Sequence, residues 1–298
     1  MRLDYQTVDV FTRTRFGGNP LAVVLDADHL DTGQMQTVAR EFSYSETVFV
    51  LKPADPRHRA RLRIFTPVGE VPFAGHPNVG AAFVLAGLER GATVPRQLVF
   101  EEQAGLVICD IAYEDECVDK VFITAPEALT TGARFSPAQT ASCLSLPAEQ
   151  VIATRHEPVI ASLGLPFLVV EIASRSGLRD ARVDMLEIAG ILPAEGADAI
   201  YLYTTDTGPE DGEVDVTARM FAPWDGVPED PATGSATGAA CALIAASRPH
   251  SRGIRRFRVA QGVDMGRTSL LEIEVPEGQA GVRIGGACVP VMSGTIEI

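Results

Sequence analysis

One sequence pattern occurs twice in this chain, first from Arg63 to Ala82 and again from Arg219 to Ala240. Each copy reads as a strand, then a loop rich in proline and glycine, then an almost wholly apolar helix. A strand that feeds such a loop and a helix N-terminus is a common way to hold an anion, because unpaired backbone N–H groups and the helix dipole point into the loop. The duplication predicts two similar domains that face one cleft.

The composition is that of a globular protein, with 298 residues of which 46% are hydrophobic and 21% charged. No apolar stretch approaches the ~20 residues of a membrane span, and the N-terminus alternates like a strand and lacks the apolar segment of a signal peptide. We therefore expect a cytoplasmic protein without membrane contact. The net charge of −14 argues against binding nucleic acid, which depends on clustered lysine and arginine.

Cofactor and metal chemistry have little basis in the sequence. The five cysteines show no spacing typical of a disulfide framework or a zinc site, and no histidine stands at metal-ligand spacing from His76. The only lysines, Lys52 and Lys120, lie outside both repeats, which makes a Schiff-base mechanism unexpected. The sequence predicts neither a metal nor a cofactor.

Alternating and β-branched segments bounded by turn residues predict many strands in both halves of the chain. We place the first domain at 1–124, a linker at 125–137 and the second domain at 138–287. The sequence leaves open whether the last strand, about 288–298, returns to the first domain. Helical patterns between the strands are expected at about 33–42, with Asp31 or Thr32 as its cap, and near 138–145 and 178–191.

Two further helices follow the repeated loops, at 77–88 and 235–246, and carry no charged residue on any face. A helix that is apolar all round must be buried all round. Without a membrane, the simplest container is a curved β-sheet wrapped around each helix. A pair of ordinary core helices between layers fits the composition equally well.

Five motifs stand in a fixed order along the chain: Ser45-Glu46-Thr47, Arg63 to Pro67, Glu70 to Pro77, Glu229 to Ser235, and Gln261 to Arg267. Together they resemble the PhzF phenazine-biosynthesis family, and the resemblance runs from about residue 8 to 297. That family resembles diaminopimelate epimerase in fold, with two pseudo-symmetric halves and an active site in the cleft between them. The resemblance implies an α+β protein in which each half is a β-sheet rolled around a central apolar helix.

Glu46 is the candidate acid–base residue. It stands at the entry to an apolar strand, where partial burial raises the pKa of a carboxyl group toward the working range of a general acid or base. On position alone, a solvated charge at a strand end is the commoner explanation. The resemblance reverses this preference, because Ser45-Glu46-Thr47 matches the family's catalytic glutamate.

The two helix starts offer candidates for substrate binding. Taken alone, His76 reads as a satisfied hydrogen-bonding group next to a Pro77 at the first helical position. Asp230 equally reads as a turn residue, and Ser235 as a helix cap. By the resemblance, these three side chains line the substrate site, together with the loop residues Gly75, Thr233 and Gly234.

The resemblance implies a cofactor-independent isomerase in which Glu46 takes a proton from one carbon and returns it to another. The family's named substrate is trans-2,3-dihydro-3-hydroxyanthranilate, whose carboxylate would lie against the helix N-termini. The expected partner is thus a small anionic metabolite, and the expected assembly is a homodimer. Whether a nearby Asp230 carboxylate or a protonated His76 dominates the ionisation of Glu46 stays open.

Three other functions remain open on the sequence. The chain could be an amino-acid racemase or epimerase, although those enzymes use a pair of thiols, and Cys241 lies one to two turns inside its helix. It could be a binding protein that holds an anionic metabolite without chemistry. It could also isomerise another small acid, because the motifs do not distinguish substrates.

Overall fold

The structure is a computed structural model that describes residues 1–89, 95–190, 192, 196–222, 224, 227–247 and 253–298. The chain divides into two compact units. Unit 1 comprises Met1–Thr124 and Gly285–Ile298, and unit 2 comprises Ala125–Ile284. Residues 125–137, expected to be a linker, belong to unit 2 and contain strand β9 (Thr130–Arg134). This strand is mostly exposed, which explains its loop-like composition.

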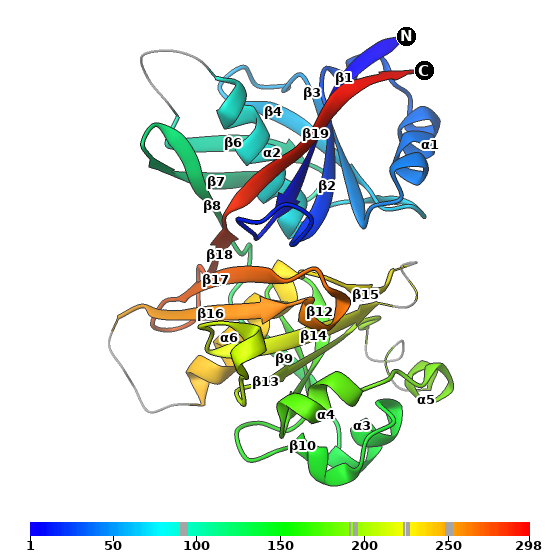
Figure 1. The fold of residues 1–298 in the computed structure, drawn as a ribbon, viewed down its shortest axis with the longest axis vertical. Coiled ribbons are helices and arrows are strands. Elements are labelled where there is room, and N and C mark those ends of the chain that lie inside the picture. The colour runs from blue at the N-terminus through cyan, green and yellow to red at the C-terminus, as the bar shows by residue number, and fades with distance from the viewer. Residues whose placement is uncertain (90–94, 191, 193–195, 223, 225–226, 248–252) are drawn as a thin grey trace. The chain divides into compact units, whose positions relative to one another are not determined.

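Unit 1 is a mixed sheet whose strands follow the order β19-β1-β2-β3-β4-β6-β7-β8, with β5 paired to β4 (Figure 1). The pairs β2–β3 and β4–β6 are parallel, and the others are antiparallel. The strands are β1 (Arg2–Val10), β2 (Asn19–Val24), β3 (Glu46–Leu51), β4 (Ala60–Phe65), β5 (Glu70–Val71), β6 (Gln97–Glu102), β7 (Gly105–Glu114), β8 (Cys117–Thr124) and β19 (Cys288–Glu297). The last strand therefore returns to the first unit, where it pairs with β1 along its whole length.

Helix α2 (Gly75–Leu88) runs inside unit 1 and contacts β1, β2, β3, β7 and β8. Every residue from His76 to Ala82 is buried, so all faces of the helix are covered. Gly80 permits the close approach of the strands, since a Cβ atom there would lie 2.5 Å from Leu21 and 2.9 Å from Val10. The prediction of a sheet wrapped around an apolar helix is confirmed for this unit.

Unit 2 repeats the arrangement, with the strand order β9-β11-β12-β13-β14-β16-β17, β10 paired to β12 and β15 paired to β14. Its strands are β9, β10 (Val151–Ile152), β11 (Val159–Ser162), β12 (Pro166–Ile172), β13 (Ile200–Thr204), β14 (Val216–Ala222), β15 (Val227–Asp230), β16 (Arg255–Gln261) and β17 (Ser269–Val275), and β18 (Arg283–Gly286) crosses from unit 2 into unit 1. Helix α6 (Gly234–Ala246) contacts β11, β12, β13, β16 and β17 and is buried continuously from Ala236 to Ile244.

The two units match strand by strand. The series β1-β2-β3-β4-β6-β7 corresponds to β11-β12-β13-β14-β16-β17, with parallel pairs at the same two places. In each unit the central helix follows a short strand, β5 or β15, that pairs with the preceding long strand. The duplication seen in the sequence therefore extends beyond the repeated segment to the topology of each whole unit.

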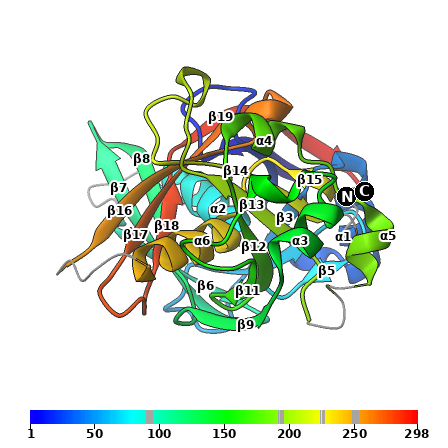
Figure 2. The same ribbon diagram turned by 90° about the horizontal axis from the view of Figure 1, so that it is seen from below.

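Helices outside the sheets cover their outer faces (Figure 2). Helix α1 (Thr32–Phe42) has Asp31, and not Thr32, as its cap: Asp31 accepts a hydrogen bond from the Gln34 N–H at 2.8 Å. In unit 2, α3 (Pro137–Cys143), α4 (Arg175–Asp180) and α5 (Met185–Ala189) contribute to the same hydrophobic core as Ile200 and Leu202 of β13. Among the described residues, short 3-10 turns lie at Ala27–His29, Ala148–Gln150, Pro209–Asp211 and Val263–Met265.

The prediction of a single helix at 178–191 was wrong. The chain leaves the helical conformation at Ala181, and a new helix begins when the Asp184 carboxylate accepts hydrogen bonds from the N–H groups of Leu186 and Glu187. The apolar pattern in the sequence continues across this break, because Leu178 of α4 and Ile188 of α5 both belong to the same hydrophobic core. Within the part of the chain that the structure describes, no helix has the length and apolar character needed to cross a membrane.

Candidate active site

The carboxylate of Glu46 lies beside the imidazole of His76 in unit 1. Glu46 is the first residue of β3, and the rest of that strand is buried, so the side chain stands where the strand leaves the core. Its Oε2 atom is 3.6 Å from Nδ1 of His76, and 19% of the Glu46 side chain is exposed against 5% for His76. The structure thus brings together two of the predicted site residues, which are 30 positions apart in the sequence.

His76 is the second residue of α2. The helix begins at Gly75, after Ala74 in an extended conformation, so Pro77 occupies the third helical position and not the first as predicted. Its missing N–H still costs nothing, because the first-turn N–H groups have no partner within the helix. Burial lowers the pKa of His76 to about 3. The imidazole is therefore neutral at physiological pH.

Asn19 orients this imidazole. It is fully buried at the start of β2, and its Nδ2 atom lies 3.4 Å from His76 Nδ1. The Ser45 hydroxyl donates to Asn19 Oδ1 at 3.5 Å, which turns the amide N–H group toward the histidine. His76 Nδ1 then accepts, and the ring proton belongs on Nε2. Sequence reasoning missed Asn19, because Gly17-Gly18-Asn19-Pro20 reads as a turn.

The Nε2 atom of His76 is buried and has no hydrogen-bond partner among the described residues. A buried N–H donor without a partner costs free energy and is normally satisfied when a ligand or water is bound. Because the ring is neutral, His76 contributes a hydrogen bond and not a positive charge beside Glu46. A neutral ring disfavours the alternative in which a protonated His76 promotes ionisation of Glu46.

In unit 2, Asp230 and Thr233 form the second group of candidate residues. Asp230 ends β15 with 9% of its surface exposed, and the Thr233 hydroxyl donates to its carboxylate at 2.5 Å. Thr233 is the residue before α6, Gly234 is the first residue of the helix and Ser235 the second. Ser235 is thus not the cap, because the extended backbone that a cap requires belongs to Thr233.

Gln261, the last residue of β16, holds this loop in place. Its amide nitrogen donates to the Asp230 carbonyl at 2.8 Å, and its amide oxygen accepts from the Thr233 N–H at 3.2 Å. The Thr237 hydroxyl, one turn into α6, lies 3.4 Å from the same amide oxygen. The sequence motif contained Gln261, but nothing local indicated that a residue 28 positions away fixes Thr233.

The repeated Arg and Glu residues form the same contact in both units. Arg63 binds Glu70 through two hydrogen bonds of 2.7 and 2.6 Å and lies over the ring of Phe65. Arg219 binds Glu229 at 2.8 and 2.9 Å and lies over Phe221. Such bidentate pairs fix geometry as well as adding energy. Each pair anchors the short strand that precedes a candidate loop.

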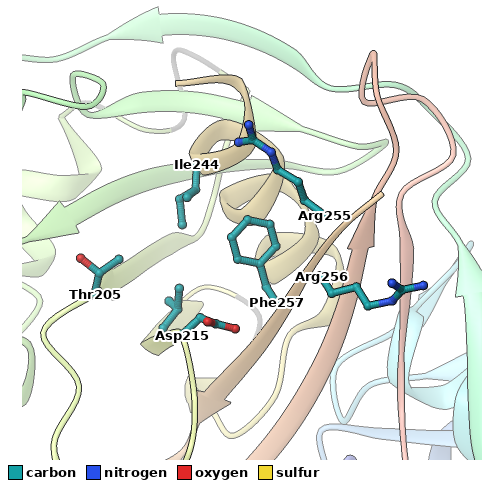
Figure 3. Close-up of a pocket in the computed structure, with 7 residues that line it drawn as sticks. Thr205, Asp215, Ile244, Arg255, Arg256 and Phe257 are labelled. Atoms are coloured by element: carbon teal, nitrogen blue, oxygen red, sulfur yellow. The ribbon is translucent and has the colours of Figure 1, made fainter. Parts of the chain in front are cut away.

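A separate cavity of about 510 Å³ in unit 2 contains none of the candidate residues (Figure 3). Thr205, Asp215, Val216, Ile244, Arg255, Arg256 and Phe257 line it. Arg255 donates to the Ala245 carbonyl, Arg256 to Glu274, and the Arg258 N–H donates to Asp215. These charged groups serve the structure, and we assign no ligand there.

The described residues include no cluster of three or more histidine, cysteine, aspartate or glutamate side chains that could hold a metal ion. The geometry around Glu46 suits proton transfer. A carboxylate can take a proton from carbon, and a neutral imidazole N–H can stabilise the negative charge that develops on a neighbouring substrate oxygen.

Comparison with known proteins identifies the family of the chain. The family model described as phenazine biosynthesis-like protein (PhzC-PhzF) matches residues 8–294. An uncharacterised isomerase of Mesorhizobium japonicum is 39% identical, over 99% of each chain. The trans-2,3-dihydro-3-hydroxyanthranilate isomerase of Pseudomonas chlororaphis is 33% identical, over 98% of each chain.

Solved structures agree on the fold. The PhzF-family phenazine biosynthesis protein of Bacillus anthracis superposes with a TM-score of 0.86 over the full length of both chains, at 24% identity. A hydroxyproline epimerase of Agrobacterium vitis superposes with a TM-score of 0.64 over 99% of this chain and 91% of its own, at 14% identity. The fold is the predicted α+β, diaminopimelate epimerase-like one. The chain belongs to the phenazine biosynthesis-like (PhzC-PhzF) family, and it is an isomerase.

Proposed function

We propose that this protein isomerises a small cyclic amino or hydroxy carboxylic acid by moving one proton between two carbons, with Glu46 as base and then as acid. The observation that carries the proposal is the Glu46 carboxylate 3.6 Å from a buried histidine. One residue that removes and returns the proton on the same face of a ring needs no second acid, so the reaction balances without an added reactant.

His76 acts in this proposal as a neutral hydrogen-bond donor. Its Nε2–H group binds a substrate oxygen and strengthens that hydrogen bond as negative charge develops during proton removal. The N-terminus of α2 at Gly75 adds a favourable dipole for an anion. Nδ1 stays occupied by Asn19, which prevents the ring from turning its proton toward Glu46.

Asp230, Thr233, Gly234 and Ser235 bind the polar groups of the substrate in this proposal. Asp230 accepts from an amine or hydroxyl group, and Gly234 and Ser235 offer backbone N–H groups at the start of α6 to a carboxylate. The hydrogen bonds from Gln261 and Thr233 give Asp230 a fixed position before substrate arrives. Such preorganisation reduces the ordering that binding would otherwise require.

The first substrate to test is trans-2,3-dihydro-3-hydroxyanthranilate, because a relative of nearly the same length carries that name. Turnover of this compound would assign the substrate. If another small cyclic amino acid is turned over and this one is not, the proton-transfer chemistry stands and the substrate assignment is wrong.

A mechanism with two opposed thiols receives little support. Cys241 is buried within α6, and burial raises the pKa of its thiol. Cys109 is buried in β7, and burial raises its thiol pKa as well. Neutral thiols are poor bases, since the thiolate is the reactive form. Racemisation of an amino-acid panel by the wild-type protein would contradict this interpretation.

The test of the proposed function is Glu46→Gln. This variant should keep binding a substrate analogue but lose at least about 10³-fold in turnover, and it should no longer place solvent deuterium in the product. Glu41→Gln, at an exposed position on α1, is the matched control and should keep wild-type turnover. A fully active Glu46→Gln variant would show that another residue carries the proton.

A further inference from the structure

A second carboxyl group lies close to the first turn of α2. Glu102 is the last residue of β6, and its carboxyl lies beside the side chain of Asn78. Both carboxyl oxygens and the Asn78 Oδ1 atom are shielded from solvent and have no hydrogen-bond partner of normal geometry among the described residues. Buried acceptor atoms without well-formed hydrogen bonds are costly, and one added proton would supply a donor between Glu102 and Asn78.

In unit 2, the residue that corresponds to Glu102 makes a full set of hydrogen bonds. Gln261 ends β16 as Glu102 ends β6, and Thr237 stands three residues after the start of α6 as Asn78 does in α2. The amide of Gln261 both donates and accepts hydrogen bonds to the loop before its helix. A carboxylate can only accept, whereas a protonated carboxyl group has the shape and the donor–acceptor pair of an amide.

The surroundings of Glu102 favour the protonated form. On the same face of the sheet, β4 contributes Leu62 and Ile64. The titratable groups of the adjacent elements on this face are Cys109 of β7, a thiol whose pKa burial raises, and the neutral His76 of α2. The cations of β4, Arg61 and Arg63, alternate with Leu62 and Ile64 and so lie on the opposite face of the sheet. Burial raises the pKa of Glu102 to about 8, against the smaller opposing effect of Asn78.

Contacts lead from Glu102 to the segment that carries His76. The Asn78 side chain donates to the Ala74 carbonyl at 2.9 Å, which fixes the residue just before α2. The Ala104 N–H, in the turn after Glu102, donates to the Pro72 carbonyl at 3.2 Å. Both contacts hold the segment Pro72–Ala74, and His76 follows it by two residues.

We propose that Glu102 is a positioning residue for His76, which in its protonated form holds Asn78 and the segment Pro72–Ala74, and which releases them when it loses its proton. The effect on turnover rests on the proposed function, but the protonation of Glu102 and its link to His76 do not. The key variant is Glu102→Gln, because glutamine reproduces the neutral acid permanently.

The first experiment follows the ¹³C carboxyl resonance of Glu102 and the imidazole resonances of His76 in the ligand-free protein between about pH 5 and pH 9. Glu102 should titrate near pH 8, and the His76 resonances should shift with the same midpoint in the wild type but not in Glu102→Gln. A Glu102 midpoint below about pH 5, or His76 resonances that ignore it, would overturn the proposal whatever the substrate is.

The second experiment measures turnover against pH. As pH rises, wild-type turnover should fall with a midpoint near pH 8. Glu102→Gln should shift this midpoint to higher pH by at least about one unit, while its turnover near pH 6.5 stays within about twofold of the wild-type value. Glu101→Gln is the matched control. Hydrogen bonds from the Asp55 and Ala54 N–H groups and from His58 lower the pKa of Glu101 to about 2, so it is ionised throughout.

Turnover of Glu101→Gln should therefore fall at the same pH as turnover of the wild type. The proposal is contradicted if Glu102→Gln keeps the wild-type midpoint of the alkaline fall in turnover, or if this variant does not fold, because glutamine keeps both the shape and the hydrogen bonds of the neutral acid. If Glu46→Gln proves fully active, the proposed function fails, and the resonance titration still decides the role of Glu102.

Discussion

His76 illustrates how one buried side chain limits the chemistry of its surroundings. Its ring lies within 4 Å of a carboxylate, yet burial keeps it neutral, because solvation lost by the charged form outweighs the attraction. A neutral ring donates from Nε2 without attracting the carboxylate. The proposed role of Glu46 therefore depends on its own partial exposure, which leaves the carboxyl group within reach of substrate and solvent.

His76→Asn should change how stability depends on pH. The folded-state pKa of His76 is about 3 and its unfolded value about 6.5, so only the unfolded wild type binds this proton between those values. Wild-type stability should therefore fall as pH drops through this range. By pH 5 the loss from this group is about 2 kcal/mol, and His76→Asn should lack it. Urea unfolding of both proteins at pH 7 and pH 5 measures the difference, and parallel losses would refute it.

The residues that sequence reasoning missed share one property: their partners are distant in the chain. Asn19 reads as a turn residue because its contact with His76 spans 57 positions. Glu102 reads as a charged strand end, since its burial depends on β4, β7 and α2. Glu46 and His76 were found through family motifs and not through periodicity. Local patterns report which face a residue occupies, but not which side chain from another element meets it.

At the scale of elements, the central helices explain why small residues recur in the repeats. Seven consecutive buried positions in α2 leave no face for a charge, and Gly80 faces Leu21 and Val10. The helix carries almost no amphipathic signal, so the sequence predicted burial from the lack of charge alone. The sheet that surrounds it could be expected from composition but not distinguished from flat layers, because both bury the same residues.

Two glycines of α2 should respond in opposite ways to alanine. Gly80→Ala places a Cβ atom 2.5 Å from Leu21 and should destabilise unit 1 by about 1–3 kcal/mol through overpacking. Gly87→Ala meets nothing within 4 Å and should stabilise the protein by up to about 1 kcal/mol through helix propensity. Denaturant unfolding of the two variants measures the sign of the change in the free energy of unfolding for each. A stabilising Gly80→Ala would show that the strands give way easily.

At the scale of the molecule, the returning strand β19 decides where one folding unit ends. It pairs with β1 from Cys288 to Glu297, and a hydrogen bond from the Ile298 N–H to the Met1 carbonyl joins the two ends of the chain. The sequence indicated a final strand but not its partner, because an alternating strand pairs with any matching edge. The homodimer expected from the family stays a prediction.

Fragments should reveal the unequal make-up of the two units. Residues 125–284 contain every strand of unit 2 and should unfold cooperatively on their own. Residues 1–124 lack β19 and should be poorly folded, until a peptide of residues 285–298 is added. Far-ultraviolet circular dichroism during thermal unfolding tests both statements. A 1–124 fragment that folds without the peptide would show that β1 tolerates an open edge.

The pairing of β1 with β19 also determines how the molecule responds to force. The two termini lie side by side at one end of an antiparallel pair, so a pull on them breaks the β1–β19 hydrogen bonds one after another from the open end. This peeling geometry resists little load. Unit 2 begins and ends in the interior of the chain, at Ala125 and Ile284, so the first hydrogen bonds that tension breaks belong to unit 1. A translocase that threads the chain from its N-terminus would therefore dismantle the Glu46–His76 pair before it reached Asp230.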